Sequence, residues 1–124
     1  MALDHETAVR DVLADAIDAA VNAAGTGNCV FDTSGDVEVA TVVLSATAFG
    51  ASSGGTITLA STTDDTSATG GTVAKFFFET GANTRIFGGT VTLPAGGGDM
   101  EMSSLAVGAG DTVSITSFTY SASA

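Results

Sequence analysis

The side chains most able to do chemistry are few in this sequence, and none stands in a catalytic pattern. His5 is the single histidine and Cys29 the single cysteine of the 124 residues. Nucleophilic catalysis needs a hydroxyl or thiol with a base placed beside it, and no G-x-S-x-G turn or similar motif supplies one. We therefore expect His5 to be a solvated helix residue and Cys29 to pack as a small apolar side chain. The prediction is that the protein is not an enzyme.

Paired acids are the other chemical candidates. Asp64 and Asp65 are adjacent in a Thr-rich segment, whereas Asp99 and Glu101 are spaced to share one face of a strand. Calcium takes roughly six to eight oxygen ligands, and no D-x-D-x-D-G pattern collects them. A glycosidase pair would also need an aromatic sugar platform, but the chain has no Trp and a single Tyr. The run Gly96-Gly97-Gly98 lacks the Lys of a phosphate-binding loop and is typical of a turn. Since none of these patterns is complete, we expect the protein to bind no metal and no cofactor.

The charge balance restricts the partners. Fourteen acids face three bases, Arg10, Lys75 and Arg85, which gives a net charge of −11. Nucleic acids and anionic membrane surfaces are bound through many Lys and Arg side chains, so we expect neither partner. No apolar run approaches the roughly 18 residues of a membrane span, and the N-terminus lacks the pattern of a signal peptide. The single cysteine allows no internal disulfide and suits a reducing cytoplasm.

The first element expected to position these residues is a helix over residues 4–24. Apolar residues recur there at three- and four-residue spacing and form one stripe, made of Val9, Val12, Leu13, Ala16, Ile17, Ala20, Val21 and Ala24. Asp11, Asp15 and Asp18 lie away from that stripe. Asp4 is the expected N-cap, and Gly25 the residue that ends the helix. Because a short helix is marginal alone, the stripe must dock on its own β domain, on another copy or on another protein.

After Gly27 the hydrophobic period changes to two, which predicts a helix and turn over residues 1–27 and a β domain over residues 28–124. About seven short strands separated by Gly and Ser clusters are indicated. They cover residues 29–32, 37–45, 56–61, 72–80, 84–93, 99–102 and 112–120. The fold class is therefore mainly β: an antiparallel β-sandwich or jelly-roll-like barrel of about seven or eight strands.

Two of these strands are apolar on both faces, which a free monomer does not need. Phe76 and Phe78 are core candidates, so Phe77 points to the opposite face. We predict a contact patch on that outer face or on the helix stripe, with the candidate residues Phe77, Lys75, Val37, Val39, Val43, Val9, Leu13, Ile17 and Arg85. The alternative is that the helix stripe covers this face within the same chain.

The segment Leu44-Ser45-Ala46-Thr47-Ala48-Phe49-Gly50-Ala51 resembles a motif of small virion structural proteins of tailed bacteriophages. In that family an Ala-rich N-terminal helix and a Gly-rich turn precede strands with G-T-A-x-x-F-like, G-x-D-L-x-L-like and A-G-D-T-V-S-V-T-S-like patterns. The counterparts here are residues 71–76, 98–102 and 109–117, so the resemblance runs along almost the whole chain. Ala46-Thr47 stands where the family pattern has Asp-Pro.

The resemblance implies a non-enzymatic head decoration or cement protein, made in the host cytoplasm and placed on the outer capsid surface of the virion. It also implies a homo-oligomer, typically a trimer, that contacts the major capsid protein and stabilises the shell by burying area across capsomer seams. Two other functions stay open. One is a fibre or adhesin module that binds a host glycan through Phe49 and Phe87 near turns, and the other is a tail-tube or connector subunit.

Overall fold

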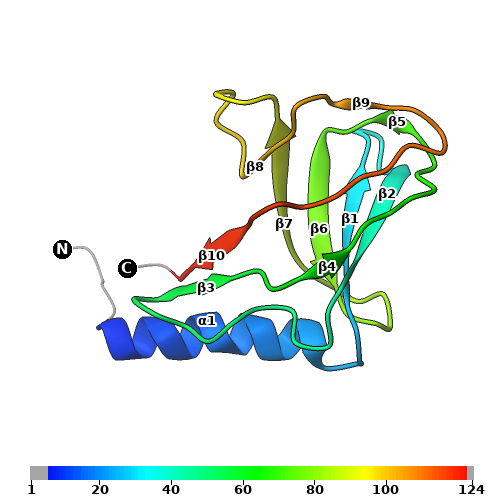
Figure 1. The fold of residues 1–124 in the computed structure, drawn as a ribbon. Coiled ribbons are helices and arrows are strands. Elements are labelled where there is room, and N and C mark those ends of the chain that lie inside the picture. Colours follow the sequence, from blue (N-terminus) through cyan, green and yellow to red (C-terminus); the bar gives the residue numbers. More distant parts are fainter. Residues whose placement is uncertain (1–5, 123–124) are drawn as a thin grey trace.

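The computed structural model describes residues 6–122 and shows a curled β-sheet with α1 lying across one end (Figure 1). The protein is mainly β with an N-terminal helix, as the change of hydrophobic period predicted. The elements are α1 (Thr7–Asn22), β1 (Asn28–Asp32), β2 (Glu38–Leu44), β3 (Thr56–Thr58), β4 (Thr62–Thr63), β5 (Gly71–Thr72), β6 (Lys75–Glu79), β7 (Arg85–Thr92), β8 (Met100–Glu101), β9 (Ala106–Val107) and β10 (Thr119–Ser121).

The main sheet has six strands in the order β4-β2-β1-β6-β7-β8. Its neighbours pair antiparallel, except that β8 lies parallel to β7. Two short ladders, β10–β3 and β5–β9, complete the described strands. In Figure 1 the segment that leads to β10 crosses in front of the sheet, so the last part of the chain covers the concave inner face.

The core is built around an aromatic cluster on that inner face. Phe78 stacks on Phe87 with ring centroids 4.7 Å apart, and Phe118 from the last segment lies 5.1 Å from Phe78 and 5.6 Å from Phe76. The prediction that Phe76 and Phe78 face the core is confirmed. Cys29 packs in the same core, and burial raises the pKa of its thiol far above the ordinary value, so the thiol stays protonated.

The face predicted for Val39 was wrong, because its side chain is 0% exposed. The β1–β2 register shifts at this point: Phe31 lies opposite Ala40, but Asp32 lies opposite Glu38. Val39 is therefore the extra residue of a β-bulge, which breaks strict alternation and turns both Val39 and Ala40 inward. Val37 and Val43 are exposed, as period two predicted.

The bounds of the helix and of several strands also differ from those predicted from sequence. The helix begins at Thr7 with Glu6 as N-cap, and Asp4 and His5 lie outside the described residues. The strand predicted over residues 112–120 is an isolated bridge at Val113 followed by β10. The short strands β4 and β9 were not predicted, and the strand predicted over residues 72–80 is divided into the end of β5 and β6. Ala14 and Val21 of α1 belong to the same core as the strands, so residues 6–27 and the β elements pack as one unit.

Candidate functional site

The predicted contact patch on the outer face of the sheet is partly closed by its own cations. Phe77 points outward as predicted, but the guanidinium carbon of Arg85 lies 3.8 Å from the centroid of its ring. This is a cation–π contact, and it leaves Phe77 half-buried. Lys75 forms an ion pair with Asp36. Both cations are thus engaged within the chain, and the patch presents charge where an open aromatic surface was expected.

A shallow hollow on this face is lined by Arg85 and by four acids. The acids are Asp32, Asp36, Glu38 and Glu79. Burial raises the pKa of Asp32, and Arg85 opposes that shift only in part. The hydrogen bond and charge of Lys75 lower the pKa of Asp36. Within residues 6–122 no group of three His, Cys, Asp or Glu is arranged to hold a metal ion.

The most informative geometry is that of α1, whose acids contact the β domain beside the buried Ala14 and Val21. Asp11 Oδ1 accepts a hydrogen bond from Gly55 N at 2.7 Å, and Asp18 Oδ1 accepts one from Phe49 N at 3.1 Å. The remaining contacts of this kind are Asp15 with Ser52 N at 3.2 Å and Ser52 Oγ at 2.8 Å, and Asn22 with Ala48 N at 3.1 Å. Figure 1 shows the segment between β2 and β3 running along the helix, as these contacts require.

This polar docking gives the segment over residues 48–55 its hydrogen-bond partners. Its backbone N–H groups lie largely outside the regular ladders, and a buried N–H without an acceptor is costly. Arg10 packs beside Asp11 against Gly55, where a Cβ atom would lie 2.8 Å from Arg10 Cβ. Acceptors about one turn apart on the helix therefore hold the backbone N–H groups of residues 48, 49, 52 and 55 along the loop.

The opposite side of α1 is apolar and exposed. Val9, Val12 and Leu13 are 45%, 66% and 40% exposed. Exposed Ala16, Ala19 and Ala23 continue this side. We define the α1 seam as Val9, Val12, Ala16, Ala19 and Ala23, whose alternating spacing of three and four residues is that of the a and d positions of a coiled coil.

The apolar stripe predicted from sequence is thus divided between two sides of the helix. Ile17 and Val21 turn towards the core, while Val9 and Leu13 stay exposed. The question of where the helix docks is answered for its polar side, which contacts its own β domain. The acids that hold it were predicted to lie away from the stripe, which is correct, but their role as loop acceptors was missed. Their spacing, with Asn22 one turn after Asp18, was the available signal.

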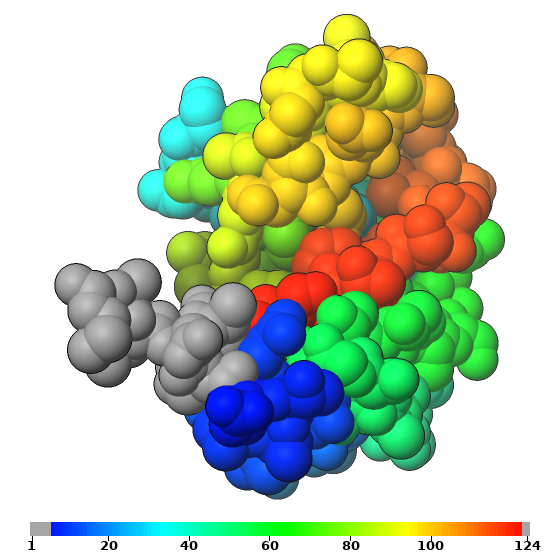
Figure 2. Space-filling model, turned by 90° about the vertical axis from the view of Figure 1, so that its left-hand side faces the viewer, coloured from blue at the N-terminus to red at the C-terminus, as the bar shows by residue number. Residues whose placement is uncertain are grey.

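The helix lies at the surface of the molecule. Figure 2 shows its first turns (blue) beside the C-terminal strand (red) and the loop that follows β2 (green). No helix in residues 6–122 combines the length and apolar character needed to span a bilayer. Comparison with protein-family models, with curated proteins and with solved structures finds no match for this chain.

Proposed function

We propose that this protein is a non-enzymatic structural subunit of a bacteriophage virion. It acts as a decoration protein that self-associates through the α1 seam and binds the major capsid protein on the outer surface of the head. The observation that carries the proposal is the orientation of α1, in which the acids face the β domain beside Ala14, Ile17 and Val21, while the apolar α1 seam faces outward. The virion assignment is supported by the resemblance of residues 44–51, 71–76, 98–102 and 109–117 to phage structural proteins.

Self-association at the seam fits the charges of the helix. The chain carries a net charge of −11, so copies repel each other over most orientations. Asp11, Asp15 and Asp18 are held on the side that contacts the β domain. The seam itself has no charged residue, so two copies can meet there without opposing acids.

The expected strength of the contact follows from its exposed residues. Full burial of a Val or Leu side chain contributes about 1.5–3 kcal/mol. The side chains of Val9 and Val12 in the seam, and of Leu13 beside it, are 40–66% exposed, so burying all three contributes about 3 kcal/mol per copy. This supports weak association in solution that is strengthened on a particle, because a lattice of identical sites raises the effective concentration.

The finer fold assignment is part of the same proposal. We take the curled sheet to be one wall of a jelly-roll-like barrel, with the segment that leads to β10 as the opposite wall. The glycan-binding alternative loses its support, because Phe49 is buried and Phe87 stacks on Phe78, so neither ring is free for a sugar. The tail-tube or connector alternative has no specific contact in its favour.

The test compares Val12→Glu with Val37→Glu by sedimentation velocity over a range of protein concentrations. The two valines are similarly exposed, at 66% and 60%, but only Val12 lies in the seam. We expect the wild type and Val37→Glu to self-associate and Val12→Glu to remain monomeric with an unchanged circular dichroism spectrum. Counting copies on purified virions tests the decoration role, since a decoration protein is present in many copies and a fibre or connector in few. A wild type that stays monomeric at every concentration would remove the basis of the proposal.

A further inference from the structure

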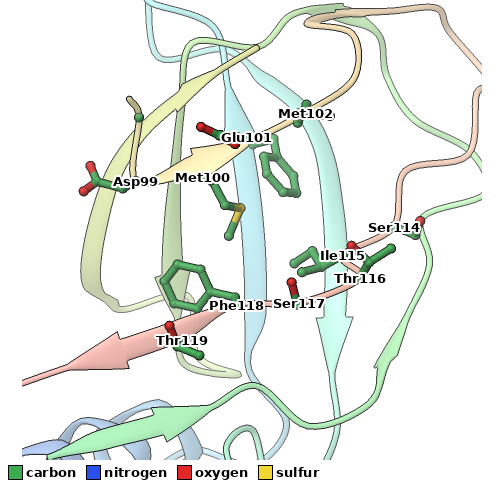
Figure 3. A pocket seen from close by; sticks show the side chains of 12 residues that line it. Asp99, Met100, Glu101, Met102, Ser114, Ile115, Thr116, Ser117, Phe118 and Thr119 are labelled. Carbon is green, nitrogen blue, oxygen red and sulfur yellow. The ribbon is translucent and has the colours of Figure 1, made fainter. Parts of the chain in front are cut away.

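A groove lies between the edge strand β8 and residues 114–119 of the last segment (Figure 3). Its volume is about 430 Å³, and Phe31, Met100, Ile115 and Phe118 are among its lining residues. Figure 3 shows Met100, Ile115 and Phe118 directed into the space between the two segments. A second hollow shares residues of both walls, including Glu101 and Ser114, so the two form one elongated groove.

One wall of the groove is an unpaired sheet edge. β8 is the last strand of the main sheet, and Met102 N donates to Thr92 O of β7 at 2.9 Å. Successive residues of a strand direct their backbone groups to opposite sides. The N–H and C=O of Glu101 therefore point away from β7, towards the open edge.

The other wall also has unpaired backbone groups. Val113 exchanges two hydrogen bonds with Asp65, at 2.8 and 2.9 Å, and Phe118 O accepts one from Leu59 N at 2.8 Å. Between these points, within the described residues, the backbone groups of residues 114–117 form no hydrogen bond with other backbone groups. Because both groups of Val113 point towards Asp65, those of Ser114 point the other way, towards the groove.

We propose that this groove binds an extended, basic segment of a partner protein by strand addition. The added strand would pair with Glu101 on one side and with Ser114 on the other, and so close the gap between β8 and the last segment. Main-chain hydrogen bonds supply the attachment in this mode of recognition, and alternate side chains supply the specificity. Every second side chain of the ligand would contact the partly exposed Ile115 and Phe118, which line the groove.

The negative charges of the groove favour a partner segment with basic side chains. Asp99 and Glu101 lie on its rim and Asp111 lines its far end, while none of the described residues that line it is basic. Lys or Arg side chains of the bound segment are therefore favoured, both in the encounter and in the complex. A second copy of this chain fits poorly, because it carries three bases against fourteen acids and two of those bases, Lys75 and Arg85, are engaged within the fold.

The probe is a short capped peptide of alternating Val and Lys with a fluorescent label, titrated by anisotropy. Two matched peptides carry Glu in place of Lys, or N-methyl groups on alternate residues. We expect the Lys peptide to bind and slow amide hydrogen exchange at Glu101 and Ser114, and both matched peptides to fail. Strand addition requires free N–H groups on the ligand, so equal binding of the N-methylated peptide overturns the proposal, as does the absence of binding by the Lys peptide.

Protein variants give a second, independent readout. Glu101→Lys should weaken binding of the Lys peptide about tenfold, because an exposed attraction becomes a repulsion. Asp64→Lys makes the same change in net charge at an exposed acid that does not line the groove, so it should change binding by less than about twofold. Equal losses in both variants would show that net charge alone drives the interaction and would refute the groove. The Val12→Glu variant should bind the peptide normally, which separates this test from that of the α1 seam.

Discussion

The carboxylate of Asp18 offers a direct test of how α1 is held. Asp18 Oδ1 accepts hydrogen bonds from Phe49 N at 3.1 Å and from Asn22 Nδ2 at 2.9 Å, and Phe49 is buried. Asp18→Ala leaves the buried N–H of Phe49 without its acceptor. A hydrogen bond to a charged group contributes about 1.5–3 kcal/mol, and an orphaned buried donor costs about 1–3 kcal/mol. Because these two figures describe overlapping effects, we expect the free energy of unfolding to fall by about 2–3 kcal/mol.

The assay is urea unfolding followed by circular dichroism, together with thermal melting. For a domain of 124 residues, that loss corresponds to a fall in Tm of about 6–12 °C. Asp18→Asn keeps an acceptor oxygen and should cost less than about 1 kcal/mol, and Val12→Asp on the exposed side should also cost little. The reasoning is refuted if Val12→Asp destabilises the monomer more than Asp18→Ala, because the helix would then be docked through its apolar side.

Three further predictions concern the β domain. Since burial raises the pKa of Asp32 above its ordinary value of 3.8, the folded state binds this proton more tightly, and stability falls as the pH rises through the raised pKa. Asp32→Asn should therefore raise Tm at pH 7 but not at pH 3; a gain of equal size at both values would contradict this. Gly27→Ala should cost about 1–3 kcal/mol in urea unfolding, because the added Cβ would lie 2.5 Å from Glu79 O. Gly35→Ala should be neutral or stabilising, because its Cβ would meet only Thr33 Oγ1, at an ordinary contact distance of 3.8 Å. Phe118→Ala should cost about 3 kcal/mol by opening the centre of the aromatic cluster, and a loss below about 1 kcal/mol would show that the last segment is not part of the core.

The longer strands β1, β2, β6 and β7 and the aromatic core were accessible from sequence, because period two is a local signal. Phe76 and Phe78 alternate with Phe77 whatever the partner strands are, and Cys29 could be assigned to the interior by type alone. Val39 could not be assigned to the interior from sequence, because its inward direction depends on the register shift opposite Asp32, which belongs to another strand. A prediction from strict inward and outward alternation of side chains cannot include a β-bulge.

The docking of α1 was left open by the sequence for a different physical reason. Hydrophobic periodicity identifies the apolar side of a helix, and in an isolated domain that side is usually the buried one. Here the loop over residues 48–55 has backbone N–H groups that need acceptors, such as that of Gly55, so hydrogen bonding places the acids on the inward side together with Ala14, Ile17 and Val21. The groove beside β8 was equally inaccessible, because it depends on where the last segment crosses the sheet.

The backbone N–H and C=O of Gly55 form hydrogen bonds with both ends of the described chain. Its N–H donates to Asp11 of α1 at 2.7 Å, and its carbonyl accepts from Ala122 N, just after β10, at 2.8 Å. The helix is synthesised before the β elements but acquires its complete set of contacts only after residue 122 has left the ribosome. A nascent chain therefore displays an unfastened α1 while the β elements are being synthesised, and a ribosome-bound chain that stops before residue 119 should expose that helix to protease where the released protein does not.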